Sequence, residues 1–80
     1  MTSKKISIDG IETELQDKKY ETLRQAVGGY IEIINLGKGK TLIMNEEGLL
    51  HKLPINKNAS KLVGFQVVGN VVIIDGDIDD

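Results

Sequence analysis

Residues 4–8 and 11–15 each alternate apolar and polar side chains, and Asp9-Gly10 separates the two runs. Alternation predicts half-buried strands, and Asp-Gly between them favours a tight hairpin because both central residues of a type I′ turn have positive φ. We therefore expect an N-terminal hairpin over residues 4–15. The residues predicted to face inward are Ile6, Ile8, Ile11, Thr13 and Leu15.

The period of the pattern changes to that of a helix between residues 17 and 27. Tyr20, Leu23 and Val27 have the i, i+3, i+7 spacing of one helix face, with Ala26 beside them. Asp17 is a suitable N-cap, and Gly28-Gly29 is a stop signal because glycine accepts the left-handed conformation. A helix over residues 17–27 follows.

A second hairpin is predicted in the middle of the chain. Residues 30–36 and 41–45 read as strands, and the segment Gly37-Lys38-Gly39-Lys40 reads as the turn between them. A further turn at residues 46–48 leads into residues 49–53. That piece reads either as a short strand or as one helical turn, and Pro54 ends it in both cases.

The last third of the chain predicts a second short helix and one more sheet segment. Asn56 is expected to cap a helix over residues 56–63 that ends at Gly64, with Ala59, Leu62 and Val63 on one side. Residues 65–68 and 71–74 suggest a last hairpin or one bent strand. Because residues 71–74 are continuously apolar, a helix or a partner chain should cover both faces of this run. The acidic tail, residues 75–80, is expected to fray.

These elements predict an α+β fold: a small, mostly antiparallel sheet of about five or six strands with two short helices. Eighty residues fit a single domain, residues 1–80. Eleven Ile, eight Leu and six Val supply most of the apolar side chains, and Phe65, Tyr20 and Tyr30 are the three aromatic residues. So few bulky rings leave a thin core, which favours a homo-oligomer.

Charge and composition exclude several classes of function. Ten basic against twelve acidic residues argue against nucleic acid binding, and no run approaches the 18 apolar residues of a membrane span. The lack of cysteine excludes thiolate metal sites and fits a cytoplasmic protein. His51 is the single histidine, and Asp75, Asp77 and Asp79 lack the distal glutamate of a calcium loop. We expect no metal, no cofactor and no enzymatic activity.

The segment from Gly37 to Thr41 partly resembles a phosphate-binding loop. That motif needs a glycine where Ile34 stands and a helix where Thr41 begins a strand, so a hairpin turn is the simpler interpretation. A glycine- and lysine-rich turn can still contact a phosphate through backbone N–H groups and ammonium charge. The candidate ligand or partner contacts are Arg24, Tyr30, Gly37, Lys38, Gly39 and Lys40.

Four short segments in order resemble a small domain-of-unknown-function family of bacteriophages and bacterial mobile elements. They lie at residues 27–32 (VGGYIE), 45–48 (NEEG), 53–56 (LPIN, with Ala59) and 69–73 (GNVVI). The similar region spans residues 27–74, with the N-terminal hairpin outside it. The resemblance implies small α+β proteins of unassigned activity, often accessory factors in host takeover or anti-defence. The shared glycine and Asn/Glu turns are expected to hold a sheet edge and its loops in one geometry.

Two functional hypotheses follow. The first is a non-enzymatic binding module that presents its sheet to a protein partner and forms a homo-oligomer. The second is a small-ligand sponge that binds a nucleotide-like or phosphorylated molecule through the Gly/Lys turn.

Overall fold

Five antiparallel strands form one sheet in the order β2-β1-β5-β4-β3, and two helices pack against it, so the predicted α+β class is confirmed. The structure is a computed structural model that describes residues 3–79. The elements are β1 (Ser3–Ile6), β2 (Glu12–Glu14), α1 (Tyr20–Val27), β3 (Ile31–Gly37), β4 (Lys40–Asn45), α2 (Lys57–Val63) and β5 (Val71–Asp75).

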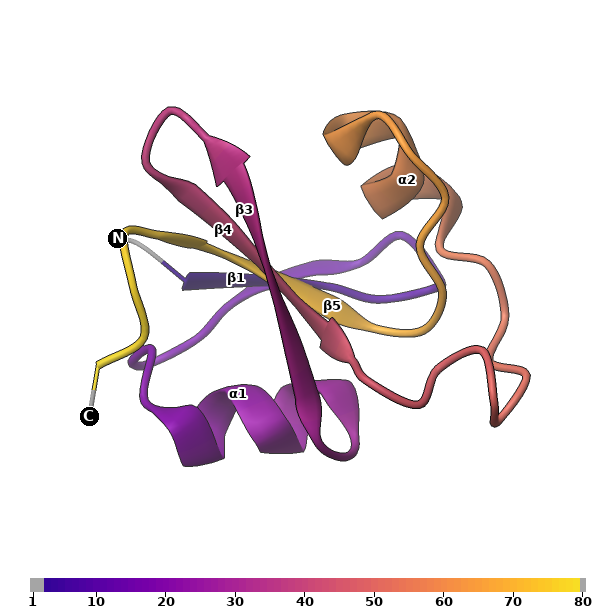
Figure 1. The fold of residues 1–80 in the computed structure, drawn as a ribbon, viewed down its shortest axis with the longest axis horizontal. Helices are drawn as coiled ribbons and strands as arrows, with labels where there is room; N and C mark the ends of the chain where they lie inside the picture. The colour runs from indigo at the N-terminus through magenta and orange to yellow at the C-terminus, as the bar shows by residue number, and fades with distance from the viewer. Residues whose placement is uncertain (1–2, 80) are drawn as a thin grey trace.

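The central strand β5 separates two layers of apolar side chains. Successive residues of a strand point to opposite faces. Val72 and Ile74 pack with Leu23 of α1 on one face, while Val71 packs with Ala59 of α2 on the other. The two helices lie on opposite sides of the sheet (Figure 1). The prediction that both faces of residues 71–74 are covered is confirmed, and helices of the same chain provide the cover.

The N-terminal hairpin is present, but its loop is wider than the two-residue turn expected. Ile6 pairs with Glu12, and residues 7–11 form the connection, in which Ser7 N–H donates to the Ile11 carbonyl at 3.0 Å. Ile6 is buried and Leu15 is half-buried. The inward orientation predicted for Ile8, Ile11 and Thr13 is wrong: all three are exposed. The ladder ends before the first two, and Thr13 lies on β2, the outermost strand.

Helix α1 begins at Tyr20, three residues after Asp17, the predicted N-cap. The Asp17 carboxylate instead accepts the Lys19 N–H at 3.0 Å, and a hydrogen bond from the Thr22 side chain lowers the pKa of Asp17. Tyr20 is exposed, whereas the other predicted face residues (Leu23, Ala26 and Val27) are buried. The predicted stop is confirmed, because Gly28 has φ +83° and donates to the Arg24 carbonyl at 3.0 Å.

Residues 46–52 form a series of turns, so the strand predicted as one alternative for residues 49–53 is wrong. The other alternative, one helical turn, is closer, because His51 N–H donates to the Glu47 carbonyl four residues earlier at 2.9 Å. Helix α2 then follows as predicted. The side chain of Asn56 accepts the Ala59 N–H at 3.0 Å, and Gly64 ends the helix with φ +86°. Leu62 does not share the buried side with Ala59, since its side chain is exposed.

The C-terminal segment contributes one strand and no final hairpin. Residues 65–70 contain a single isolated bridge, between Val68 and Ile55, before β5 begins. The tail expected to fray is tied back to the fold through residue 79: Gly76 N–H donates to the Gly39 carbonyl at 2.6 Å, and Asp79 N–H to the Lys18 carbonyl at 2.9 Å. Asp80 lies outside the described residues.

Candidate functional site

The two outer strands of the sheet differ in length and in charge. Strand β2 is three residues long, and its Glu12 and Glu14 place acidic groups along that edge. Strand β3 is seven residues long, and Glu32 is its one charged residue. Short, charged edges resist pairing with another chain, whereas a long apolar edge is a template for it. The β3 edge is therefore the open end of this sheet.

The hydrogen-bond pattern identifies which β3 backbone groups point outward. The Tyr30 carbonyl accepts the Glu46 N–H at 2.9 Å, so the backbone N–H and C=O groups of Tyr30 point toward the β4 side. In an antiparallel pair, alternate residues direct both backbone groups to the neighbouring strand. Because the β3–β4 ladder is regular up to Asn35, the residues that present their N–H and C=O groups outward are Ile31, Ile33 and Asn35.

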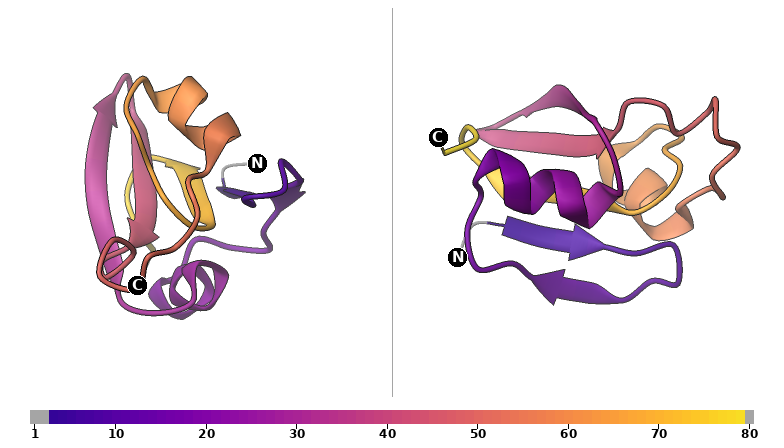
Figure 2. Two further views of the ribbon diagram at one scale, coloured as in Figure 1. Left: turned by 90° about the vertical axis from the view of Figure 1, so that its right-hand side faces the viewer. Right: turned by 90° about the horizontal axis from the view of Figure 1, so that it is seen from below.

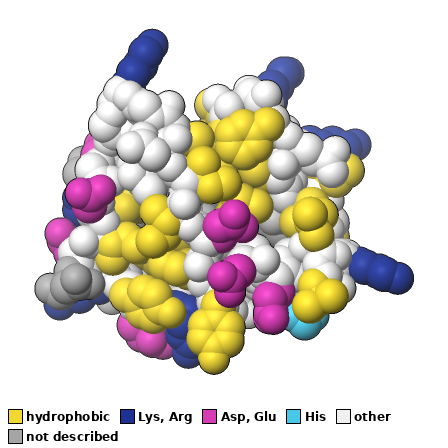
Figure 3. Space-filling model, viewed as in Figure 1, with side chains coloured by type: hydrophobic (Ala, Val, Ile, Leu, Met, Phe, Trp, Pro, Cys, Tyr) yellow, Lys and Arg dark blue, Asp and Glu magenta, His cyan; other side chains and the backbone are white. Residues whose placement is uncertain are grey.

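An apolar hollow lies beside this edge on the α1 side of the sheet. It has a volume of about 380 Å³ and is lined by Tyr20, Ile33, Thr41, Asp77 and Ile78. Ile33 is 57% exposed and Tyr20 is 43% exposed. Hydrophobic side chains gather over β3 on the face shown in Figure 3, and lysine and arginine side chains project from its periphery.

Arg24 and Tyr30, two of the candidates named from sequence, lie beside this edge and not at the Gly/Lys turn. Arg24 Nε donates a hydrogen bond to Glu21 Oε1 at 3.4 Å, and this bond raises the pKa of Arg24. Tyr20 and Tyr30 are close enough to add to the increase. Tyr30 is 63% exposed immediately before β3. The half-buried arginine and the two exposed tyrosines thus lie next to the open edge.

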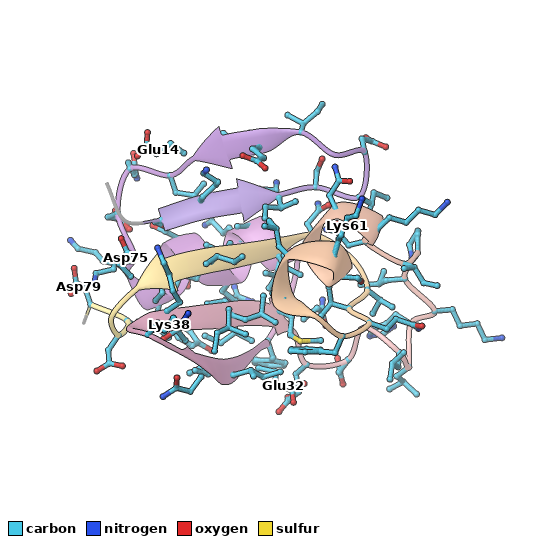
Figure 4. All side chains as sticks on the ribbon, turned by 90° about the horizontal axis from the view of Figure 1, so that it is seen from above. Glu14, Glu32, Lys38, Lys61, Asp75 and Asp79 are labelled. Atoms are coloured by element: carbon cyan, nitrogen blue, oxygen red, sulfur yellow. The ribbon has the colours of Figure 1, made fainter. Side chains whose placement is uncertain are left out.

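A groove of about 510 Å³ occupies the other face of the sheet, where α2 covers only part of it. Figure 4 shows α2 over one end of the sheet, while the end that carries Glu14, Asp75 and Lys38 has no helix above it. The two views of Figure 2 show how the β1–β2 hairpin and the β3–β4 hairpin flank β5. The apolar lining comes from Ile6, Leu36, Leu62, Val63 and Ile73.

The rim of the groove carries both signs of charge. Lys4 pairs with Glu12 at 3.2 Å, and Lys40 pairs with Asp75 at 2.5 Å. The hydrogen bond from Lys40 is the main reason that the pKa of Asp75 is lowered. The paired lysines are partly neutralised, while Lys38 is exposed at the tip of the hairpin. The groove can take an apolar group whose anionic end meets Lys38.

The remaining sequence candidates meet at this groove. Gly37, Lys38 and Lys40 line it, and Gly39 completes the turn, in which Lys38 has φ +54° and Gly39 has φ +74°. Positive φ at both central residues is the geometry of a type I′ hairpin turn. Strand β3 separates this group from Arg24 and Tyr30, which lie at its opposite end.

Sequence reasoning missed the groove residues outside the turn, which are Ser3, Lys4, Ile6, Glu12, Glu14, Leu36, Leu62, Val63, Ile73 and Asp75. The alternation in residues 4–8 was a usable signal, because it places Lys4 and Ile6 on one face. What alternation could not provide was the partner strand. Only the β1–β5 register sets Lys4 opposite Ile73 and so brings that face to the groove.

The four segments of the resemblance hold loops in place. Asn45 Nδ2 donates to the Val27 carbonyl at 3.1 Å, which joins β4 to the end of α1. Asn56 Nδ2 donates to the carbonyls of Ile6 and Gly69, each at 2.9 Å. These contacts explain the segments structurally, and neither asparagine lines the groove or the hollow.

Within residues 3–79, no group of three or more His, Cys, Asp or Glu side chains is arranged to hold a metal ion. No helix in this part of the chain is long and apolar enough to cross a membrane. The family model of a domain of unknown function, DUF3846, matches residues 3–80 and so includes the N-terminal hairpin. No curated protein and no solved structure matches the chain significantly.

Proposed function

Because the chain belongs to the DUF3846 family, whose function is unknown, we propose a function from the geometry of its sheet. The protein is a non-enzymatic binding module that adds a strand of a protein partner to the open edge of β3. The observation that carries this proposal is the contrast between the acidic, three-residue β2 edge and the apolar, seven-residue β3 edge.

Main-chain pairing at a sheet edge supplies affinity, and side-chain pockets beside the edge supply specificity. Ile31, Ile33 and Asn35 offer the free backbone groups, and the hollow next to Ile33 offers a pocket. Tyrosine and arginine are the residue types enriched at binding hot spots. Arg24, Tyr20 and Tyr30 place these types beside the edge.

The test compares one substitution on each edge. Ile33→Lys places a charge on the β3 edge, and Thr13→Lys places the same charge on the β2 edge, where the side chain is also exposed. Each variant is immobilised, and the proteins it retains from cells that express the chain are quantified. The proposal expects a protein that wild type and Thr13→Lys retain and Ile33→Lys loses at least tenfold. Equal retention by all three chains would show that the partner binds elsewhere.

A second candidate function is favoured by the groove, which brings Gly37, Lys38 and Lys40 together over an apolar floor. Its volume lies within the roughly 300–1,000 Å³ of small-molecule sites. In this function the protein sequesters a nucleotide-like or phosphorylated molecule, with the phosphate at Lys38. Thermal-shift measurements with nucleotides test it. A rise in Tm of several degrees that Lys38→Asn abolishes and Lys61→Asn keeps supports the sponge, and no rise in wild type refutes it.

Either mode suits a role as an accessory factor of a bacteriophage or mobile element, acting in host takeover or anti-defence. Such a factor acts by occupying a surface of a host protein or by removing a small molecule, and neither action requires catalysis. Recovery of a host protein through the β3 edge, in the capture experiment above, would support this role. Recovery of no host protein would argue against a role in which the chain binds one.

A further inference from the structure

We propose that the strand added to β3 is β3 of a second copy of this chain. The two copies pair in antiparallel fashion about a twofold axis at Ile33, which joins two five-stranded sheets into one of ten strands. The inference rests on the proposed function, since it identifies a partner for the same open edge.

The outward backbone groups determine this register. A paired strand must bring residues with outward groups opposite one another, and those residues are Ile31, Ile33 and Asn35. With the axis at Ile33, Ile33 pairs with its own copy, and each Ile31 pairs with Asn35 of the other copy. Each of these three residue pairs exchanges two backbone bonds, about six in all. One strand thus satisfies every outward group of its copy over residues 31–35.

Neighbouring registers are less favourable. An axis at Glu32 sets the two Glu32 carboxylates directly opposite, and like charges in that position are destabilising. An axis at Ile34 needs Gly37 to pair with Ile31, but the ladder is irregular between Asn35 and Gly37. Around Ile33, each Glu32 lies opposite Ile34 of the other copy, and the irregular part of β3 stays outside the pairing.

The side chains beside the edge favour a second copy as the occupant. Twofold pairing places the α1 side of both sheets on the same side, so each Ile33 lies opposite Ile33 of the other copy, next to the wall that Ile33 forms for the hollow. The Ile33 side chain is 57% exposed, and this apolar surface is what Ile33 of the second copy would bury. The apolar side chain that matches Ile33 is therefore present in this chain.

Single cysteines test the register, because the chain has no cysteine of its own. Non-hydrogen-bonded antiparallel pairs bring opposite residues closer, with Cα atoms about 4.5 Å apart, which lies within the range that a disulfide spans. With the axis at Ile33, Glu32 lies opposite Ile34 of the other copy in such a pair. Glu32→Cys and Ile34→Cys should therefore cross-link under mild oxidation when mixed and not when each is alone, and Thr13→Cys on the other edge should not cross-link. Cross-linking by Thr13→Cys in place of the mixed pair would overturn the proposal.

Light scattering measures the assembly itself. Wild type and Thr13→Lys should have twice the 8.8 kDa mass of one chain, and Ile33→Lys should have the mass of one chain. A wild-type monomer at millimolar concentration would overturn the proposal, as would a dimer of Ile33→Lys. Circular dichroism tests whether the variants are folded. If Ile33→Lys is unfolded, cross-linking of the mixed cysteine pair tests the proposed dimer in its place.

The two proposals fail separately. A monomeric chain that retains a foreign protein through β3 removes the second copy as partner and keeps the proposed function. If the chain is monomeric and Ile33→Lys changes no capture, both proposals are wrong.

Discussion

Replacement of Asn56 by alanine is expected to be among the most destabilising single changes in this protein. The side chain is fully buried and makes three hydrogen bonds. Its oxygen accepts the Ala59 N–H at 3.0 Å, and its amide donates to the carbonyls of Ile6 and Gly69, both at 2.9 Å. One side chain therefore joins α2, β1 and the segment that leads into β5.

The magnitude follows from the groups left behind. A buried donor or acceptor that loses its partner costs about 1–3 kcal/mol, so Asn56→Ala should cost about 3–5 kcal/mol. A domain of this length has a free energy of unfolding on the order of 4–12 kcal/mol. The substitution consumes a large share of that total, and Tm should fall by roughly 12 °C or more.

Urea denaturation followed by circular dichroism measures the loss. Asn58→Ala is the matched control, because Asn58 is exposed on the same helix, and its midpoint should stay close to that of wild type. Asn56→Asp separates the helix cap from the bridge: it keeps the acceptor for Ala59 but has no amide to donate. It should be nearly as unstable as Asn56→Ala. A loss below about 1 kcal/mol for Asn56→Ala would refute the reasoning.

Three further predictions concern turns and charge. Lys38→Asn should raise the free energy of unfolding by about 0.5–1 kcal/mol, because Lys38 has φ +54° and Asn-Gly is the preferred type I′ pair; an unchanged urea midpoint would contradict this. Gly69→Ala should cost more than Gly37→Ala in the same assay. Both have positive φ, but only at Gly69 would a Cβ lie 2.8 Å from another side chain. Lys40 lowers the pKa of Asp75 in the folded protein, so the ionised Asp75 carboxylate stabilises the folded state. This contribution is present above the ordinary carboxyl pKa and is lost as pH falls below about 4. Asp75→Asn should therefore lower Tm at pH 6 and leave it unchanged near pH 2, and an equal loss at both pH values would exclude the ion pair as the cause.

Features determined by a few neighbouring residues could be predicted from sequence. The β3–β4 hairpin, the Asn56 cap and the glycine stops at Gly28 and Gly64 were all predicted, because each depends on turn chemistry within about four residues. The prediction of a two-residue turn in the N-terminal hairpin was wrong, although Asp-Gly strongly favours such a turn. There the ladder ends at Ile6, and Ser7 closes a wider loop by bonding to Ile11.

Features that depend on distant residues could not be predicted in this way. The groove combines residues of all five strands and of α2, and its existence depends on β5 lying between β1 and β4. No local pattern specifies that order. The same holds for the open edge: residues 30–36 were predicted as a strand, but their position at the end of the sheet is set by which strands pair elsewhere.

The position of β5 has a consequence for how the chain acquires its structure. This strand, residues 71–75, joins β1 to β4, although it is synthesised after the other four strands of the sheet. Until it is made, the chain holds two separate hairpins with unpaired inner edges, and neither buries a full face. Contacts between such distant residues slow folding and leave exposed strands open to aggregation. Translation that stops before residue 71 would therefore yield an aggregation-prone fragment and not a smaller version of the domain.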